Sequence, residues 1–137
     1  MKLDNKKFKK GFTLIELMIV MSIILILLSV MVPKFSGYQQ KAKKVKVVNT
    51  AKQIYQSALL SYGEQDGSFN DAKVIDTVNQ ITGLGISEHD IKSNDGDILG
   101  IHFISDNKDY RVTIHASQNY FEVTDAKQST VYSSLNP

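Results

Sequence analysis

A single acidic residue in an otherwise apolar stretch is the feature of this sequence with the clearest chemical meaning. Glu16 is the only charged side chain between Phe12 and Val32, a run of 21 residues. An ionised carboxylate in an apolar environment is costly unless a cation or hydrogen-bond donors satisfy it. An acidic residue inside such a run is by default a candidate functional residue, and Glu16 then needs a partner. The alternative is that its carboxylate is protonated or reaches the membrane surface.

The remaining polar residues form no recognisable catalytic or metal-binding pattern. The chain has no cysteine, which excludes a disulfide framework, a thiolate zinc site and a cysteine nucleophile. The three histidines, His89, His102 and His115, have no acidic or serine partner in a familiar order, so we interpret them as surface or half-buried side chains. The segment from Ser93 to Asp97 lacks the full ligand set of a calcium loop. We predict no enzyme activity, no bound metal and no cofactor.

The run from Phe12 to Val32 has the length and composition of a membrane-spanning helix. A helix of 21 residues is about 31 Å long, which matches a hydrocarbon core of about 30 Å. The lysines at 2–10 are expected to stay in the cytoplasm by the positive-inside rule, with residues 34–137 outside. The run is too long for the apolar region of a secretory signal. A plain single-pass anchor fits the length but does not explain Glu16.

Charge is divided into blocks along the chain. Residues 1–11 carry a net charge of +4, and residues 34–55 contain six lysines and no acid. Residues 56–137 contain 5 basic and 12 acidic side chains, a net charge of −7. Such a domain repels nucleic acid phosphates, so we expect no nucleic acid partner for it.

Apolar residues continue at helical spacing beyond the membrane run, every three or four positions from residue 35 to residue 62. One helix from about Phe12 to about Tyr62 is predicted, with Gly63 as its C-cap. Pro33 and Gly37 lie inside this helix and predict a kink or a loosened turn. The alternative interpretation is that they only mark the exit from the membrane.

The second half of the chain predicts a small α+β domain. Asn70 can cap a short helix that ends at Gly83, and residues 85–97 are expected to form a loop with a possible turn of helix. Apolar and β-branched runs then predict strands at Ile98–Ser105, Tyr110–Ala116 and Tyr120–Thr124, with a possible short one near Thr130–Tyr132. Because the connections are too short for crossover helices, we expect an antiparallel sheet of about 3–4 strands packed on the long helix.

The six residues from Gly11 to Glu16, Gly-Phe-Thr-Leu-Ile-Glu, resemble the class III leader junction of type IV prepilins and of their pseudopilin relatives. The resemblance extends over residues 1–62 through three further features. These are the lysine-rich leader before the junction, the uncharged run that follows Glu16, and the proline at position 33. The resemblance implies that the prepilin peptidase cleaves between Gly11 and Phe12 and then N-methylates Phe12. It also implies that Glu16 pairs with the new amine on Phe12 of a neighbouring subunit during filament assembly.

The resemblance implies a division of the chain and a fold. Residues 1–11 are a leader peptide removed on maturation, residues 12–33 a transmembrane and then filament-core helix, and residues 34–137 the amphipathic half of that helix plus a globular head. The implied fold is pilin-like, one long N-terminal helix packed on an antiparallel sheet. Many pilins close the C-terminal region with a disulfide, which this chain cannot form, so the adhesive role of that loop is not carried over.

The function implied is a structural subunit of a type IV pilus. The chain would sit in the cytoplasmic membrane with its N-terminus inside and then join an extracellular helical homo-oligomer for adhesion, twitching motility or biofilm formation. A membrane platform and ATPases are indirect partners. The lysines of residues 34–55 either form a collar at the membrane surface or face the acidic heads of adjacent subunits, and the second arrangement predicts filaments that weaken at high salt.

Two alternatives remain open at this point. The chain could be a pseudopilin of a type II secretion or DNA-uptake (competence) machine, with the same assembly residues. It could also be a membrane-anchored binding domain that never polymerises, in which case residues 1–11 stay attached.

Overall fold

The computed structural model describes residues 11–94 and 96–136. The chain divides into two compact units, Met1–Gln40 and Lys41–Pro137. One helix, α1 (Leu14–Glu64), belongs to both units and contains Pro33 without an interruption. The single long helix predicted for about residues 12–62 is thus confirmed, with its ends displaced by two residues.

The predicted C-cap of α1 at Gly63 is wrong, because the helix continues through this glycine to Glu64. The left-handed conformation occurs instead at Asp66, with φ of 55°, and at Gly67, with φ of 81°. The backbone N–H of Gly67 donates to the carbonyl of Tyr62 at 3.2 Å, which satisfies one of the free carbonyls at the helix end. The spacing of apolar residues thus located the end of α1 to within a few residues. It did not identify Asp66 and Gly67 as the residues with positive φ at which the chain turns.

The second unit contains a further helix, α2 (Asp71–Thr82), and a single 3₁₀ turn, η1 (Glu88–Asp90). Asn70 caps α2, since its side-chain oxygen accepts a hydrogen bond from the backbone N–H of Lys73 at 3.2 Å. Gly83 ends α2 in the left-handed region with φ of 67°. Both predicted caps of this helix are confirmed.

The strands form one antiparallel sheet in chain order, so each strand pairs with the next one along the sequence. In the described part of the chain there are five of them: β1 (Ile91–Asn94), β2 (Ile98–Ser105), β3 (Lys108–His115), β4 (Tyr120–Asp125) and β5 (Thr130–Ser133). The four strands predicted from the sequence are confirmed. The additional strand, β1, lies in the segment expected to be a loop. Its four residues include one apolar side chain, so pairing with β2 rather than local pattern makes it a strand.

A two-residue turn sets the register of the central hairpin. Asp106 and Asn107 both have positive φ, 50° and 59°, as a type I′ turn requires, and Ser105 lies opposite Lys108. Residues at alternate positions then face the same side of the sheet. On β2 the inward residues are Leu99, Ile101 and Phe103, all at most 3% exposed.

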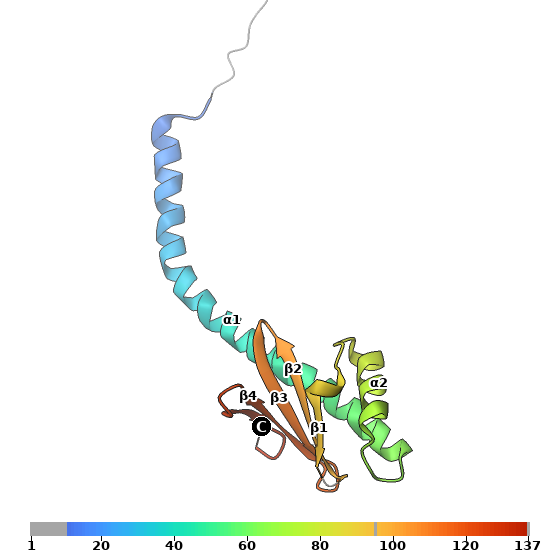
Figure 1. Cartoon of the computed structure of the whole chain (residues 1–137). Coiled ribbons are helices and arrows are strands. Elements are labelled where there is room, and N and C mark those ends of the chain that lie inside the picture. Colours follow the sequence, from blue (N-terminus) through green and yellow to red (C-terminus); the bar gives the residue numbers. More distant parts are fainter. Residues whose placement is uncertain (1–10, 95, 137) are drawn as a thin grey trace, which may run out of the picture. The chain divides into compact units, whose positions relative to one another are not determined.

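The inner face of the sheet packs with one face of α1 in a common hydrophobic core. Figure 1 shows the strands lying across the C-terminal part of α1, with α2 beside the end of that helix. The contribution of α1 comes from residues spaced three or four apart, namely Val47, Ala51, Ile54 and Ala58. The α+β class and the pilin-like arrangement of a long helix on an antiparallel sheet are therefore confirmed.

Candidate processing and assembly site

The residues with predicted roles in processing lie at the N-terminal end of α1 and are freely accessible. Gly11, Phe12 and Thr13 precede the helix without regular structure, and Phe12 is 95% exposed. A methyl group built on Gly11 would have no protein atom within 4 Å. Cleavage between Gly11 and Phe12 and methylation of Phe12 stay predictions, and the lysine-rich part of the leader, residues 1–10, lies outside the described residues.

Thr13 and Glu16 form a reciprocal pair of hydrogen bonds at the start of α1. The backbone N–H of Thr13 donates to Oε2 of Glu16 at 2.8 Å, and the backbone N–H of Glu16 donates to Oγ1 of Thr13 at 3.3 Å. This is the capping-box arrangement, in which two residues three apart satisfy backbone N–H groups that the first helical turn leaves free. Glu16 therefore has a local role in addition to its predicted role in assembly.

Thr13 is a residue whose role the sequence analysis missed. Its hydroxyl was expected only to donate to a helix carbonyl, yet the spacing Thr-x-x-Glu before an apolar run is a recognisable signal for a capping box. A carboxylate can accept about four hydrogen bonds. The bond to Thr13 therefore leaves Glu16 able to accept an ammonium group from another molecule.

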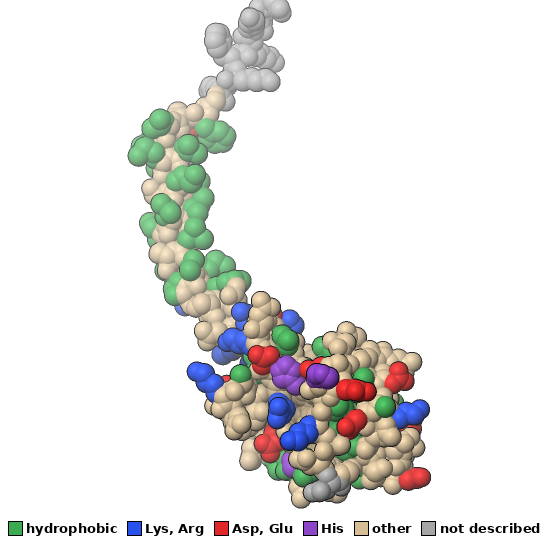
Figure 2. Space-filling model, viewed as in Figure 1, with side chains coloured by type: hydrophobic (Ala, Val, Ile, Leu, Met, Phe, Trp, Pro, Cys, Tyr) green, Lys and Arg blue, Asp and Glu red, His purple; other side chains and the backbone are tan. Residues whose placement is uncertain are grey.

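The helix that follows exposes an apolar surface on all sides. Every residue from 11 to 40 is exposed, and the large hydrophobic side chains from Leu14 to Val32 are 44–77% exposed. Figure 2 shows these side chains along the helix. The hydroxyl groups of Ser22 and Ser29 donate to the carbonyls of Met18 and Ile26 at 2.8 and 2.7 Å, so they add no unpaired polar group.

By length and composition, α1 is the one helix in the described part of the chain that could cross a membrane. Soluble proteins rarely expose a continuous apolar surface of this extent without a partner. Lipid or other apolar helices are the environments that would cover it.

The residues predicted to weaken α1 lie in its fully exposed part. Pro33 has no N–H to donate, and its carbonyl accepts a hydrogen bond from the hydroxyl of Ser36 at 2.9 Å. A Cβ added at Gly37 would meet no atom within 4 Å, so packing does not require a glycine there. A kink or softened turn at these two positions stays a prediction.

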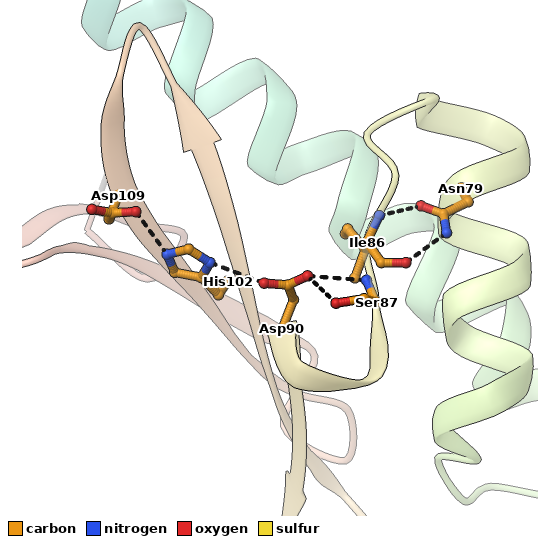
Figure 3. A network of polar contacts seen from close by, with 6 residues as sticks. All are labelled: Asn79, Ile86, Ser87, Asp90, His102 and Asp109. Carbon is orange, nitrogen blue, oxygen red and sulfur yellow. Dashed lines mark hydrogen bonds and ion pairs between the residues drawn. The ribbon is translucent and has the colours of Figure 1, made fainter.

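The second unit contains a polar network that the sequence analysis did not find, drawn in Figure 3. His102 on β2 lies between two carboxylates, with Nδ1 at 3.3 Å from Oδ1 of Asp90 and Nε2 at 3.1 Å from Oδ1 of Asp109. The sequence analysis found no acidic partner for His102 and the structure shows two, whereas the interpretation of His102 as a half-buried side chain is confirmed. Asp109 comes close only through the β2–β3 hairpin and Asp90 only through η1, so sequence order conceals the contact.

Two further contacts join this network to α2. Asp90 Oδ2 accepts hydrogen bonds from the hydroxyl of Ser87 at 2.7 Å and from its backbone N–H at 3.0 Å. These donors, with a smaller contribution from His102, hold the pKa of Asp90 below its ordinary value. The Asn79 side chain accepts from the N–H of Ile86 at 2.6 Å and donates to its carbonyl at 2.8 Å. In the connection between α2 and β1, Ile86 is thus bonded to α2 and the next residue, Ser87, is bonded to Asp90. Both contacts have a structural role.

The segment with weak similarity to a calcium loop also has a structural role. Asp97 accepts hydrogen bonds from the hydroxyl and backbone N–H of Ser117 at 2.6 and 2.8 Å and from Tyr62 at 3.3 Å. Ser117 thereby lowers the pKa of Asp97, while burial, with the charge of Asp97, raises the pKa of Tyr62. Among the residues that the structure describes, no group of three or more histidine, aspartate or glutamate side chains could hold a metal ion.

Comparisons with known proteins agree with these features. A family model described as the prokaryotic N-terminal methylation motif matches residues 6–32. The chain is similar to the type IV major pilin protein PilA of Myxococcus xanthus (strain DK1622), 39% identical over 57 residues, which is 42% of this chain and 26% of that protein. It is also similar to a fimbrial protein of Moraxella nonliquefaciens, 37% identical over 102 residues, which is 69% of this chain and 65% of the relative. The chain thus spans less than two thirds of either relative, and no solved structure matches it.

Proposed function

We propose that this chain, which carries the type IV prepilin motif and is related to type IV pilins, is a structural subunit of a type IV pilus and not an enzyme. The observation that carries the proposal is an accessible Gly11–Phe12 junction followed by an unburied apolar helix with one carboxylate in its first turn. The capping bonds with Thr13 use only part of the hydrogen-bonding capacity of this carboxylate, and recognition of another subunit gives the remaining capacity a use that a lipid anchor does not have.

The first proposed step is maturation in the membrane. The lysine-rich residues 1–10 stay on the cytoplasmic side, where the prepilin peptidase hydrolyses the peptide bond after Gly11. Phe12 then carries a free α-amino group. In its neutral form this amine takes a methyl group from a methyl-sulfonium donor bound to the same enzyme, the donor leaves as a neutral thioether, and the methylated terminus is an ammonium group at neutral pH. The backbone near Gly11 supports this step, since a residue without a Cβ lets a catalytic centre approach closely.

The second proposed step is assembly. The ammonium group on Phe12 of one subunit pairs with Glu16 of its neighbour as both leave lipid for the filament core. Each charge alone is costly in a low-dielectric environment, and the pair satisfies both. Pairing at one depth along the helix also sets the axial register between subunits, as a single buried polar residue does in a coiled coil.

The remaining roles follow from this arrangement. Residues 12–33 become the filament core, while residues 34–137 form the amphipathic half of α1 and the head on the outside. The weak helix region around Pro33 and Gly37 lets a filament extend without breaking contacts in the head. A membrane platform and ATPases drive the assembly, and adhesion, twitching motility or biofilm growth are the expected outputs.

The test is to recover the protein from surface shear fractions of cells that express it and to measure its intact mass. We expect a chain that starts at Phe12 and carries one added methyl group. The substitution Gly11→Val should block cleavage and leave the full chain in the membrane. A surface protein that keeps residues 1–11 would contradict the proposal and favour a non-polymerising anchor.

Substitution of Glu16 tests the assembly step separately. Glu16→Leu should leave membrane insertion and cleavage intact and reduce filaments at least tenfold, because one buried charge pair is worth more than the ~1.4 kcal/mol of a tenfold change. Glu122→Gln, which removes a carboxylate from the head, is the control and should leave filaments unchanged. Normal filament yield in Glu16→Leu would refute the pairing. Loss of secretion or DNA uptake on deletion, without long surface fibres, would instead assign the chain to the pseudopilins.

A further inference from the structure

Two groups of opposite charge lie at the two ends of the part of α1 that belongs to the second unit. We name Lys41, Lys43 and Lys44 the basic collar. We name four acidic residues at the other end the acidic pole: Glu64, Asp66, Asp71 and Asp76. Figure 2 shows Lys and Arg side chains gathered where the helix enters the second unit.

The collar lysines have no partner within the described part of the subunit, unlike two other lysines on α1. Lys46 forms an ion pair with Asp106 at 3.0 Å, and the ammonium group of Lys52 lies 5.7 Å from the centre of the Tyr132 ring. In the described residues, the three collar lysines are exposed and have no carboxylate within 4 Å.

The acidic pole is likewise free of ion pairs in the part of the chain that the structure describes. Glu64, Asp66 and Asp76 are exposed, and Asp71 is half-buried. Lys73 is the only basic residue between positions 64 and 82, so this segment has a net charge of −3. The pole therefore presents negative charge around the end of α1 and along α2.

The two groups cannot neutralise one another within a single copy. Lys44 and Glu64 are separated by 20 residues of continuous helix, which is about 30 Å. Exposed charges at that distance are screened at physiological ionic strength, where the Debye length is about 8 Å. A second copy displaced along the helix axis by roughly this length would bring opposite charges into contact.

We infer that the basic collar of one subunit contacts the acidic pole of another copy of this chain. The inference rests on the proposed function, because it assigns a specific contact between subunits of the filament. The two surfaces differ, so the contact is heterologous, and repeated heterologous contacts that do not close produce an open helical filament. The contact joins the amphipathic half of α1 in one subunit to the end of α1 and to α2 in another, and it is separate from the pair between Glu16 and the amine on Phe12.

An anionic membrane surface is the competing occupant for the collar, since clustered lysines near a membrane attract acidic lipids. The acidic pole distinguishes the two. A lipid surface that contacts the collar does not reach the pole, which lies about 30 Å away along the helix, whereas a second copy of the chain requires both groups.

The experiment is a charge exchange in the full-length protein expressed in cells, with sheared filaments as the readout. Lys43→Glu combined with Lys44→Glu should reduce filament yield several-fold, and so should Glu64→Lys combined with Asp76→Lys. These four side chains are exposed and make no side-chain hydrogen bond in the structure, so folding should be unaffected. The chain carrying all four changes should recover most of the lost yield, because opposite charges again face each other.

The matched control is Lys108→Glu combined with Lys127→Glu, two exposed lysines outside the collar, which should leave the yield unchanged. Wild-type filaments should also lose subunits at high salt. Filaments of the chain that carries all four substitutions should show the same salt dependence. Loss of yield in the lysine variant without rescue by the exchange, accompanied by weaker binding to vesicles that contain acidic lipids, would assign the collar to the membrane and overturn the inference. Normal filament yield from both the variant with two collar substitutions and the variant with two pole substitutions would overturn the inference as well. Absence of filaments from the wild-type chain would instead refute the proposed function.

Discussion

The two units of this chain differ in what their apolar side chains contact. In the second unit, the described residues include sixteen buried hydrophobic side chains that form one core. In the first unit, no side chain between residues 11 and 40 is buried, although its composition is more apolar. The second unit is therefore complete as a folded domain, whereas the first needs lipid or other subunits to cover it.

This difference determines how a mutation in each unit should act. A change in the core of the second unit should lower the free energy of unfolding of the head, and assembly should fall only because less folded protein remains. A change in the first unit should leave the head stable and act on membrane insertion or on assembly. A pair of leucine substitutions tests that separation directly, and two smaller effects test the contacts that complete the second unit.

The largest effect is expected from a matched pair of leucine substitutions. Leu99→Ala on β2, where Leu99 is fully buried, should lower the free energy of unfolding by about 2–5 kcal/mol through lost burial and a cavity. Leu27→Ala on α1, where Leu27 is 63% exposed, should change it by less than about 0.5 kcal/mol and instead weaken filaments. Urea unfolding of the full chain in detergent micelles measures the first effect. Equal destabilisation by both substitutions would contradict the division into a complete and an incomplete unit.

An intermediate effect is expected at Asn79, which holds the connection between α2 and β1. Asn79→Ala removes both hydrogen bonds to the backbone of Ile86 and should destabilise the head by about 1–3 kcal/mol. Asn49→Ala on α1 is the control, because Asn49 is exposed and makes no side-chain hydrogen bond in the described structure. Faster hydrogen exchange in residues 83–90 of Asn79→Ala alone would locate the effect, and unchanged exchange there would disprove it.

The smallest effect is expected from Asp90 and depends on pH. Because hydrogen bonds from Ser87 lower the pKa of Asp90 in the folded state, its contribution to stability is complete above about pH 4, the ordinary pKa of aspartate. The contribution is lost as the pH falls below that value and through the lowered pKa of the folded state. Asp90→Asn should therefore destabilise the head at neutral pH by on the order of 1 kcal/mol and lose less stability on acidification. Glu88→Gln, an exposed neighbour, should keep the wild-type pH dependence, and an unchanged pH profile in Asp90→Asn would refute the role of Asp90.

The elements that are predictable from the sequence are those with a strong local signal. The spacing of apolar residues predicted α1, and Asn70 and Gly83 predicted the two ends of α2. Runs of apolar and β-branched residues predicted β2 to β5. The short strand β1 and the Asp90–His102–Asp109 contact gave no such signal. Both depend on how the sheet pairs its strands: β1 is a strand only through its pairing with β2, and Asp90 and Asp109 reach His102 from positions 12 and 7 residues away.

The sequence by itself determined the segregation of charge, the apolar run with Glu16 and the Gly11–Phe12 junction, because these are properties of residue order along one helix. It also contained the capping signal at Thr13, which needs only a spacing of three residues. The tertiary structure decided which lysines of α1 have a partner in the same subunit and which have none among the described residues. That distinction depends on distances between side chains in α1, the β2–β3 turn and β5, and chain order does not specify such distances.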